Sequence, residues 1–223
     1  NAEPLNIEYN SIKIKQYKKV TYLGCILDAT LSGESMALNV LNKINSRLKF
    51  LKRQENFLDI TLRRLLCNAM IQPFFDYACS AWYPNLNKSI QDRLQSAQNK
   101  CIKFCLKIGQ RTSVKKKDFE AINWLNVHDR FLQVIASTVF RFFKNCIPEY
   151  MDEIYFPADQ EGMSTRFSYQ KLQIPRRKTK MGMKSLSYMA PSFWNTLPKP
   201  LKLSITLNSF KHKLKDYFFS QAE

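Results

Sequence analysis

The chain has 223 residues, and 45% of them are hydrophobic, so it can bury a core and is not expected to be globally disordered. It carries 35 basic and 18 acidic side chains, a net charge of +17, but only five glycines. So few glycines argue against a glycine-rich nucleotide-binding loop and against a sheet-dominated fold with many tight turns. So high a charge repels itself in a compact chain, which indicates a polyanionic partner such as nucleic acid or an anionic membrane.

Neither a membrane-spanning segment nor a secretion signal is predicted. The sequence has no run of about twenty apolar residues, the length that crosses a bilayer, and its first ten residues are polar. The missing initiator Met suggests a fragment. The six cysteines form no C-x-x-C pair and no zinc-site spacing, so we expect buried free thiols in a reducing compartment, the cytoplasm or the nucleus.

Residues 5–28 are predicted to be β. Apolar and polar residues alternate on either side of Asn10-Ser11, which predicts a hairpin with a tight turn at that point. A second apolar run, residues 20–27, has the length and the β-branched content of one further strand, and it ends at Asp28.

Three amphipathic helices are predicted next, with Ser32, Asp59 and Asn87 as candidate N-caps. Pro73 is expected to kink or end the second helix, which then continues as a short aromatic-rich segment to Trp82. The predicted inward faces are Ala37, Val40, Leu41, Ile44, Leu48 and Leu51 in the first helix, Leu62, Leu65, Leu66, Ala69 and Met70 in the second, and Ile90, Leu94, Ala97, Cys101, Phe104, Cys105 and Ile108 in the third.

The rest of the chain is predicted to be mainly helical after a boundary at residues 109–112. The expected elements are a short helix over 115–122, a mostly buried helix over 127–146, short strands at 163–169 and 172–174, a short helix over 188–197, and a last helix capped by Thr206. The predicted fold is therefore mainly α (α+β), with an N-terminal β-hairpin, a three-helix bundle, and a helical C-terminal lobe with a few short strands.

No catalytic constellation is evident. Two-metal phosphoryl transfer needs converging carboxylates, but the acidic residues stand apart, no D-x-D or F/Y-x-D-D motif occurs, and Asp76 in Phe-Phe-Asp-Tyr is a single aspartate. Nucleophile-elbow and phosphate-loop motifs are absent. The two histidines, His128 and His212, have no nearby Cys or Ser partner. We therefore predict no catalytic residue, no metal site and no cofactor for this chain.

Binding chemistry is better represented, in three basic clusters. The first is on the third helix, where about 100° per residue brings four cations together on the flank of the apolar stripe; we call this set the basic ridge, and it consists of Arg93, Lys100, Lys103 and Lys107. The other two clusters are Lys115, Lys116 and Lys117, and then Arg176, Arg177, Lys178 and Lys180. Clustered Lys and Arg attract phosphates by releasing counterions.

Each basic cluster could by itself be a solvated face, and it is the net charge that favours nucleic acid. Trp82, Tyr83 and Trp194 could stack on bases, or they could pack in the core. Binding to a membrane surface needs a helix with a free apolar face, and every apolar stripe here has an obvious partner, so we expect no membrane partner.

Two stretches carry a family resemblance. The first runs from Lys19 to Asp28 (K-V-T-Y-L-G-C-I-L-D) and continues through Pro73 to Trp82. It resembles a pattern that follows the palm of non-LTR (LINE-type, jockey-like) retrotransposon reverse transcriptases. The second, residues 187–198 (S-Y-M-A-P-S-F-W-N-T-L-P) with 207–215, resembles their C-terminal signature, and Trp124-Leu125 with residues 145–151 resembles the region between.

The resemblance covers essentially the whole chain and implies its organisation. Residues 1–31 would be the end of the palm, with a turn at Tyr22-Leu23-Gly24 near the region that holds the primer. Residues 32–109 would be the thumb, a three-helix bundle that grips template–primer. Residues 110–223 would be a C-terminal domain that binds nucleic acid. The implied partners are RNA, DNA, an RNA–DNA hybrid and the remainder of the reverse transcriptase.

The catalytic part of such an enzyme has no counterpart in this sequence. The palm motif with paired aspartates is missing, so Mg²⁺ would belong to the missing palm, and polymerisation by this chain alone is not expected. Two alternatives stay open: a degenerate or domesticated remnant that acts as a protein-interaction scaffold, and an active enzyme whose aspartates come from another chain.

Overall fold

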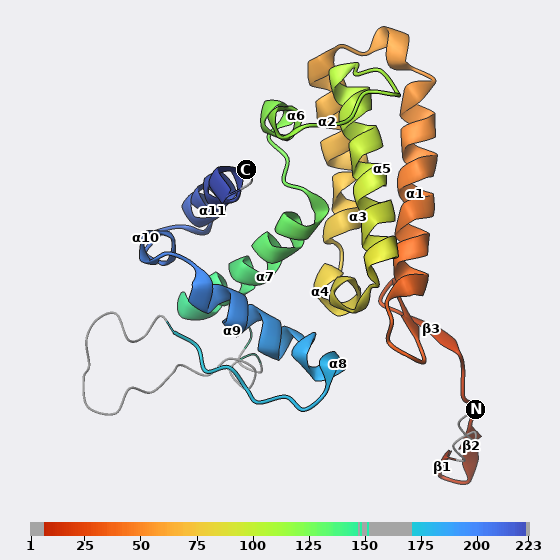
Figure 1. The fold of residues 1–223 in the computed structure, drawn as a ribbon. Helices are drawn as coiled ribbons and strands as arrows, with labels where there is room; N and C mark the ends of the chain where they lie inside the picture. Colours follow the sequence, from red (N-terminus) through yellow and green to blue (C-terminus); the bar gives the residue numbers. More distant parts are fainter. Residues whose placement is uncertain (1–6, 147, 149–150, 152–170, 222–223) are drawn as a thin grey trace.

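The computed structural model describes residues 7–146, 148, 151 and 171–221, and this part of the chain is mainly helical with two small antiparallel hairpins (Figure 1). The predicted fold class is confirmed. The shorter helical elements are η1 (Glu55–Phe57), α3 (Gln72–Asp76), α4 (Cys79–Trp82), η2 (Tyr83–Asn85), α8 (Lys180–Met183) and α10 (Lys199–Lys202).

The first hairpin forms where the sequence predicted it. Strands β1 (Ile7–Tyr9) and β2 (Ile12–Ile14) pair antiparallel, and the turn residues Asn10 and Ser11 both have positive φ, at 48° and 61°. Positive φ at both central residues is what a two-residue turn needs to match the twist of its strands. All residues of both strands are exposed.

The expected single strand over residues 20–27 is wrong. The chain turns back at Leu23-Gly24, where φ is 47° and 77°, and forms a second hairpin from β3 (Lys19–Tyr22) and β4 (Cys25–Asp28). The apolar run continues through the turn, so the hydrophobic pattern alone does not reveal it. The Tyr77 hydroxyl donates a hydrogen bond to the Leu23 carbonyl and ties this turn to the helices.

Three helices, α1 (Glu34–Lys52), α2 (Ile60–Met70) and α5 (Lys88–Leu106), pack against one another as a bundle. The predicted inward faces of α1 and α5 are buried, apart from Ile108, which is half-buried. Asp59 and Asn87 cap α2 and α5 by accepting hydrogen bonds from the backbone N–H of Leu62 and Ile90.

The start of α1 differs from the prediction, because its N-cap is Gly33 and not Ser32. Gly33 has a φ of 72°, and a side chain there would collide with the carbonyl oxygen of Trp82 in α4. The position therefore requires glycine both for its conformation and for its space. The Ser32 hydroxyl still accepts a hydrogen bond from the N–H of Glu34.

The predicted inward face of α2 is largely wrong. Leu62, Leu65 and Ala69 are exposed, and the helix turns Arg63 and Cys67 inward instead. The cause is the Arg63 guanidinium, which binds three backbone carbonyls inside the bundle, as described below. Hydrophobic periodicity ignores such a polar interaction, because it treats every arginine as an outward residue.

The C-terminal part is built around α7 (Val127–Phe143). This helix packs against α9 (Leu186–Thr196) and α11 (Leu207–Gln221), and it also contacts α3, α4 and α5, so it lies between the bundle and the last helices (Figure 1). The core between α7, α9 and α11 is aromatic: Phe140 stacks on Phe210 with ring centroids 4.7 Å apart, and Trp194 lies against both Phe143 and Phe210.

In the C-terminal part, two predicted short helices and one predicted helix cap are confirmed, whereas a predicted strand is not. The helices predicted over 115–122 and 188–197 correspond to α6 (Lys116–Ile122) and α9, and the Thr206 hydroxyl caps α11 by accepting from the N–H of Ser209. The strand predicted over 172–174 is reduced to a single β-bridge residue, Leu172. The side chain of Asn195 also binds both the N–H and the carbonyl of Leu172. The strand predicted over 163–169 lies outside the described residues.

Candidate nucleic-acid interface

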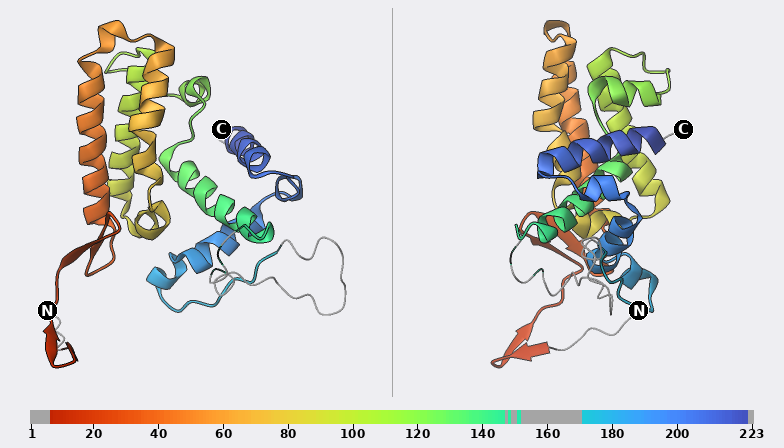
Figure 2. Two further views of the ribbon diagram at one scale, coloured as in Figure 1. Left: turned by 180° about the vertical axis from the view of Figure 1, so that it is seen from behind. Right: turned by 90° about the vertical axis from the view of Figure 1, so that its left-hand side faces the viewer.

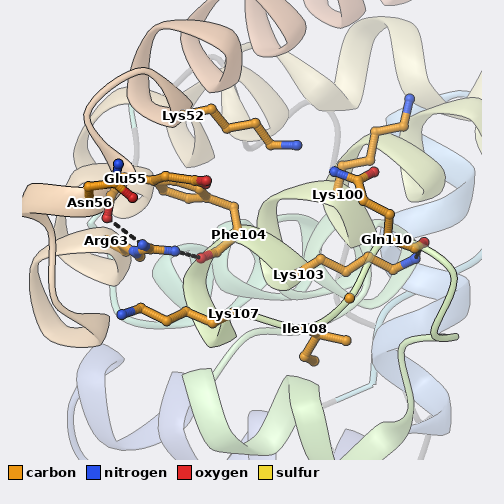
Figure 3. Close-up of a pocket in the computed structure, with 11 residues that line it drawn as sticks. Lys52, Glu55, Asn56, Arg63, Lys100, Lys103, Phe104, Lys107, Ile108 and Gln110 are labelled. Atoms are coloured by element: carbon orange, nitrogen blue, oxygen red, sulfur yellow. Dashed lines mark hydrogen bonds between the residues drawn. The ribbon is translucent and has the colours of Figure 1, made fainter.

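One end of the bundle carries a pocket of about 550 Å³ between the C-terminal ends of α1 and α5, η1 and the start of α2 (Figure 3). We call it the basic pocket. Its lining residues are Lys52, Glu55, Asn56, Arg63, Lys100, Lys103, Phe104, Lys107, Ile108, Gly109 and Gln110.

The basic pocket is strongly positive. It gathers five cations, Lys52, Arg63, Lys100, Lys103 and Lys107, against one carboxylate, Glu55. The C-terminal ends of α1 and α5 also meet here, and each contributes a partial negative charge of roughly half a unit. These two helix ends offset about one of the cations. An excess of positive charge is left over, which would attract an anion.

Arg63 builds the wall of the basic pocket. Its guanidinium donates to the carbonyls of Leu58 and Phe104, both at 3.0 Å, and to that of Glu55. The Phe104 carbonyl lacks a helical partner because the N–H of Ile108 bonds to Lys103 instead, so Arg63 caps the end of α5. All three arms are therefore engaged with backbone, and Arg63 is a framework residue and not a free ligand-binding group.

The four lysines of the pocket sit in different local settings. The Lys103 ammonium donates to the Gln110 carbonyl at 2.7 Å, which ties the loop after α5 to the helix. Lys107 is the C-cap of α5 and adopts a left-handed conformation with φ 55°. Lys100 and Lys107 are exposed, and Lys52 is half-buried. Three of the lysines thus remain available to an incoming anion.

The structure brings together three of the four ridge residues. Lys100, Lys103 and Lys107 line the basic pocket, whereas Arg93 does not. Arg93 is exposed on the same flank of α5, seven residues before Lys100. Seven residues span about 10 Å along a helix axis. The sequence prediction missed Lys52, because it belongs to a different helix. Its position in the last turn of α1, the helix end that meets the end of α5, could have indicated that it joins the ridge residues.

The other two predicted clusters do not join the basic pocket. Lys115, Lys116 and Lys117 are exposed at the start of α6, where the N–H of Lys115 bonds to Asp118 at 2.8 Å. Arg176, Arg177, Lys178 and Lys180 are exposed just before and at the start of α8. Figures 1 and 2 place α8 at the opposite end of the molecule from η1 and the end of α5. The three clusters therefore do not form one continuous surface.

The three aromatic residues considered for base stacking are core residues. Trp82 and Trp194 are each 1% exposed and Tyr83 is 4% exposed, so the alternative of core packing is correct for all three. Burial raises the pKa of Tyr83 to about 12. Two exposed aromatic residues that sequence reasoning did not single out, Phe50 and Phe57, lie within two positions of pocket-lining residues in the chain.

The acidic, histidine and cysteine residues that were considered for catalysis or metal binding do not converge on a site in the described part of the chain. Asp76 pairs with Arg130 of α7, and His212 bonds to Asp216 at 3.1 Å. Five cysteines are buried free thiols as expected, but Cys146 is exposed. Among the described residues, no group of three or more His, Cys, Asp or Glu side chains is placed to hold a metal ion. In the same part of the chain, no helix is both long and apolar enough to cross a membrane.

Comparison with known proteins adds no relative. No family model, no curated protein and no solved structure matches the chain. Function must therefore be inferred from the geometry and charge of the basic pocket.

Proposed function

We propose that this chain binds nucleic acid by its phosphate backbone, with the basic pocket as the principal contact. The observation that carries the proposal is the convergence of Lys52, Lys100 and Lys107 from two helices on one pocket that holds a single carboxylate. Lysine and arginine contacts to phosphate give affinity without reading base sequence. The binding is therefore sequence-tolerant and strongly dependent on salt.

We further propose that the chain does this as the thumb and C-terminal region of a non-LTR reverse transcriptase, with the catalytic aspartates elsewhere. The support is the resemblance of its motifs together with where they lie. Ala190, Trp194 and Leu197 of the C-terminal signature are buried, and Asn195 holds Leu172. These buried residues build the fold. The exposed lysines of the bundle would contact the template–primer.

The alternative is a protein-interaction scaffold, and one observation favours it. Leu62 and Leu65 of α2 are 44% and 59% exposed, and apolar residues in that position suit a protein partner. The excess of positive charge favours nucleic acid over this alternative, because an apolar protein contact has no use for it.

The test is fluorescence anisotropy with a short labelled RNA–DNA hybrid at low salt. A variant with Lys52→Gln, Lys100→Gln and Lys107→Gln removes three cations of the basic pocket and leaves Lys103 to hold its loop. A matched control with Lys18→Gln, Lys184→Gln and Lys213→Gln removes three exposed cations outside the three basic clusters. Both variants have the same net charge.

We expect the pocket variant to lose roughly tenfold or more in affinity, because three phosphate contacts are removed. The control should stay within about threefold of the unmodified chain, since it alters only the distant field. Equal losses in the two variants would mean that the net charge, and not the basic pocket, is responsible. No binding of the unmodified chain at low salt would reject nucleic-acid binding and favour the scaffold.

A further inference from the structure

Phe57 presents its ring to solvent at the tip of the bundle. Its side chain is 83% exposed, the largest exposure of any aromatic residue in the described part of the chain. The phenylalanine ring has no hydrogen-bonding group, so it offers a ligand only its aromatic face and edge. Its exposure leaves that face open to a ligand.

The position of Phe57 ties it to the basic pocket. Phe57 is the last residue of η1, and the two residues before it, Glu55 and Asn56, line the pocket. Phe50, 51% exposed, precedes the pocket residue Lys52 by two positions. Figure 1 shows η1 as the connection across the tip of the bundle between α1 and α2. The two exposed rings and one pocket lysine, Lys52, therefore come from the same short stretch of chain.

The backbone that carries Phe57 is held in place. Arg63 donates to the carbonyls of Glu55 and Leu58, which lie on either side of Phe57 in the chain. The N–H of Phe57 itself bonds to the Gln54 carbonyl at 3.0 Å. A ring on a fixed backbone loses little conformational entropy when a flat ligand covers it.

The surroundings of Phe57 indicate the chemistry of that ligand. Arg53 at the end of α1 and Arg64 of α2 are exposed on either side of η1, and the two residues before Phe57 line the basic pocket. An apolar protein segment would have to cover the ring among these cations. A nucleotide carries both required parts, an anionic phosphate and a flat base. Aromatic rings beside a basic groove are the usual combination for binding single strands.

We propose that Phe57 is a stacking platform for an unpaired base whose phosphate lies in the basic pocket, so that the chain prefers single-stranded nucleic acid, or a strand end, over uninterrupted duplex. The inference rests on the proposed function and names its substrate class. In a duplex each base is covered on both faces by its neighbours, so its face is closed to Phe57. A single strand offers both its phosphates and its base faces.

The experiment compares a labelled single-stranded 12-mer with a fully paired duplex of the same sequence, using the full chain and the variants Phe57→Leu and Phe57→Trp. Phe57→Leu keeps an apolar side chain but removes the aromatic face. Phe57→Trp enlarges that face and adds a fluorescent reporter. The three native tryptophans, Trp82, Trp124 and Trp194, are at most 3% exposed, so they should respond little to the ligand.

We expect the unmodified chain to bind the single strand more tightly than the duplex. Phe57→Leu should weaken single-strand binding by about fivefold or more, the lower end for one stacked base, and leave duplex binding unchanged. The salt dependence should stay the same, because stacking releases no counterions. Phe57→Trp should keep the affinity, and its fluorescence should be quenched by the single strand.

The contrary outcomes separate this inference from the proposed function. Binding of both ligands with no effect of Phe57→Leu, and no quenching in Phe57→Trp, would overturn the stacking platform and leave the basic pocket standing. Equal weakening of both ligands by Phe57→Leu would also overturn it, because a stacking contact must discriminate between them. Absence of any binding by the unmodified chain would reject the proposed function itself.

Discussion

Arg130 and Asp76 form a two-pronged ion pair that joins α7 to the end of α3, with Nε to Oδ1 at 2.5 Å and Nη2 to Oδ2 at 2.6 Å. The two side chains are 24% and 37% exposed. The pair therefore links the helical bundle to the C-terminal helices at a partly desolvated position. It also accounts for the aspartate of the Phe-Phe-Asp-Tyr segment, which is held by an arginine and is part of the framework.

A double-mutant cycle with Arg130→Gln and Asp76→Asn should give a coupling free energy of about 1–3 kcal/mol in urea unfolding, because a two-pronged charged contact is strong when partly desolvated. The pair Lys88 and Asp92 is a suitable control. Its N–O distance is 3.2 Å, but its side chains are 83% and 62% exposed, so its coupling should lie below about 0.5 kcal/mol. Equal coupling in the two pairs would contradict the linking role of Arg130.

Arg63 should not tolerate replacement by lysine. Arg63→Lys removes the forked guanidinium and orphans at least one of three backbone carbonyls, so we expect a loss of about 2–4 kcal/mol of unfolding free energy. The neighbouring Arg64 is exposed, and Arg64→Lys should change stability by less than about 0.5 kcal/mol. Urea unfolding followed by circular dichroism measures both. A small effect of Arg63→Lys would show that the pocket wall does not depend on this residue.

Lys107→Gly should separate binding from stability. Lys107 has a φ of 55°, so glycine relieves its backbone strain and should raise the unfolding free energy by about 0.5–1 kcal/mol. The same change removes a cation of the basic pocket and should weaken binding to an RNA–DNA hybrid. Lys100→Ala, a change within the helix, should weaken binding to a similar extent without the gain in stability. Unchanged binding in a stabilised Lys107→Gly chain would exclude Lys107 from the interface.

The buried thiols should be inert at neutral pH. Burial raises the pKa of both the Cys79 and the Cys101 thiol from 9.0 to about 12. The raised pKa makes stability depend on pH, because between pH 9 and 12 the unfolded chain releases thiol protons that the folded chain retains. The free energy of unfolding should therefore be unaffected by these thiols below pH 9 and should fall as the pH rises from 9 to 12. With Ellman's reagent at pH 8 and under native conditions, Cys146 should react fast and the other five cysteines only on unfolding. Fast reaction of a second thiol would contradict the buried core.

The elements that the sequence predicted well are those governed by local physical chemistry. Asp59, Asn87 and Thr206 cap their helices through their own side chains, and the signal for each lies within three residues. The apolar stripe of α5 follows the helical period and is buried. The turn at Asn10-Ser11 needs only residues that accept positive φ.

The predictions that failed depend on contacts between distant residues. The outward turn of Leu62 and Leu65 follows from Arg63, which reaches the Phe104 carbonyl 41 residues away. The strand expected over 172–174 is a single bridge residue, Leu172, whose N–H bonds to Asn195, 23 residues further on. The basic pocket was predictable in part: the ridge on α5 is visible in one helix, but Lys52 and Arg63 join it only through the packing of the bundle.

Whether the basic pocket holds phosphates is tested most directly by the salt dependence of hybrid binding. The two chains to compare are the unmodified chain and the variant with Lys52→Gln, Lys100→Gln and Lys107→Gln. Each phosphate contact contributes about 0.9 to the slope of log affinity against log salt. If the basic pocket holds phosphates, the unmodified chain has a steep slope, and the variant's slope is smaller by about two to three. Equal slopes for the two chains would contradict the account, because the three lysines would then release no counterions on binding.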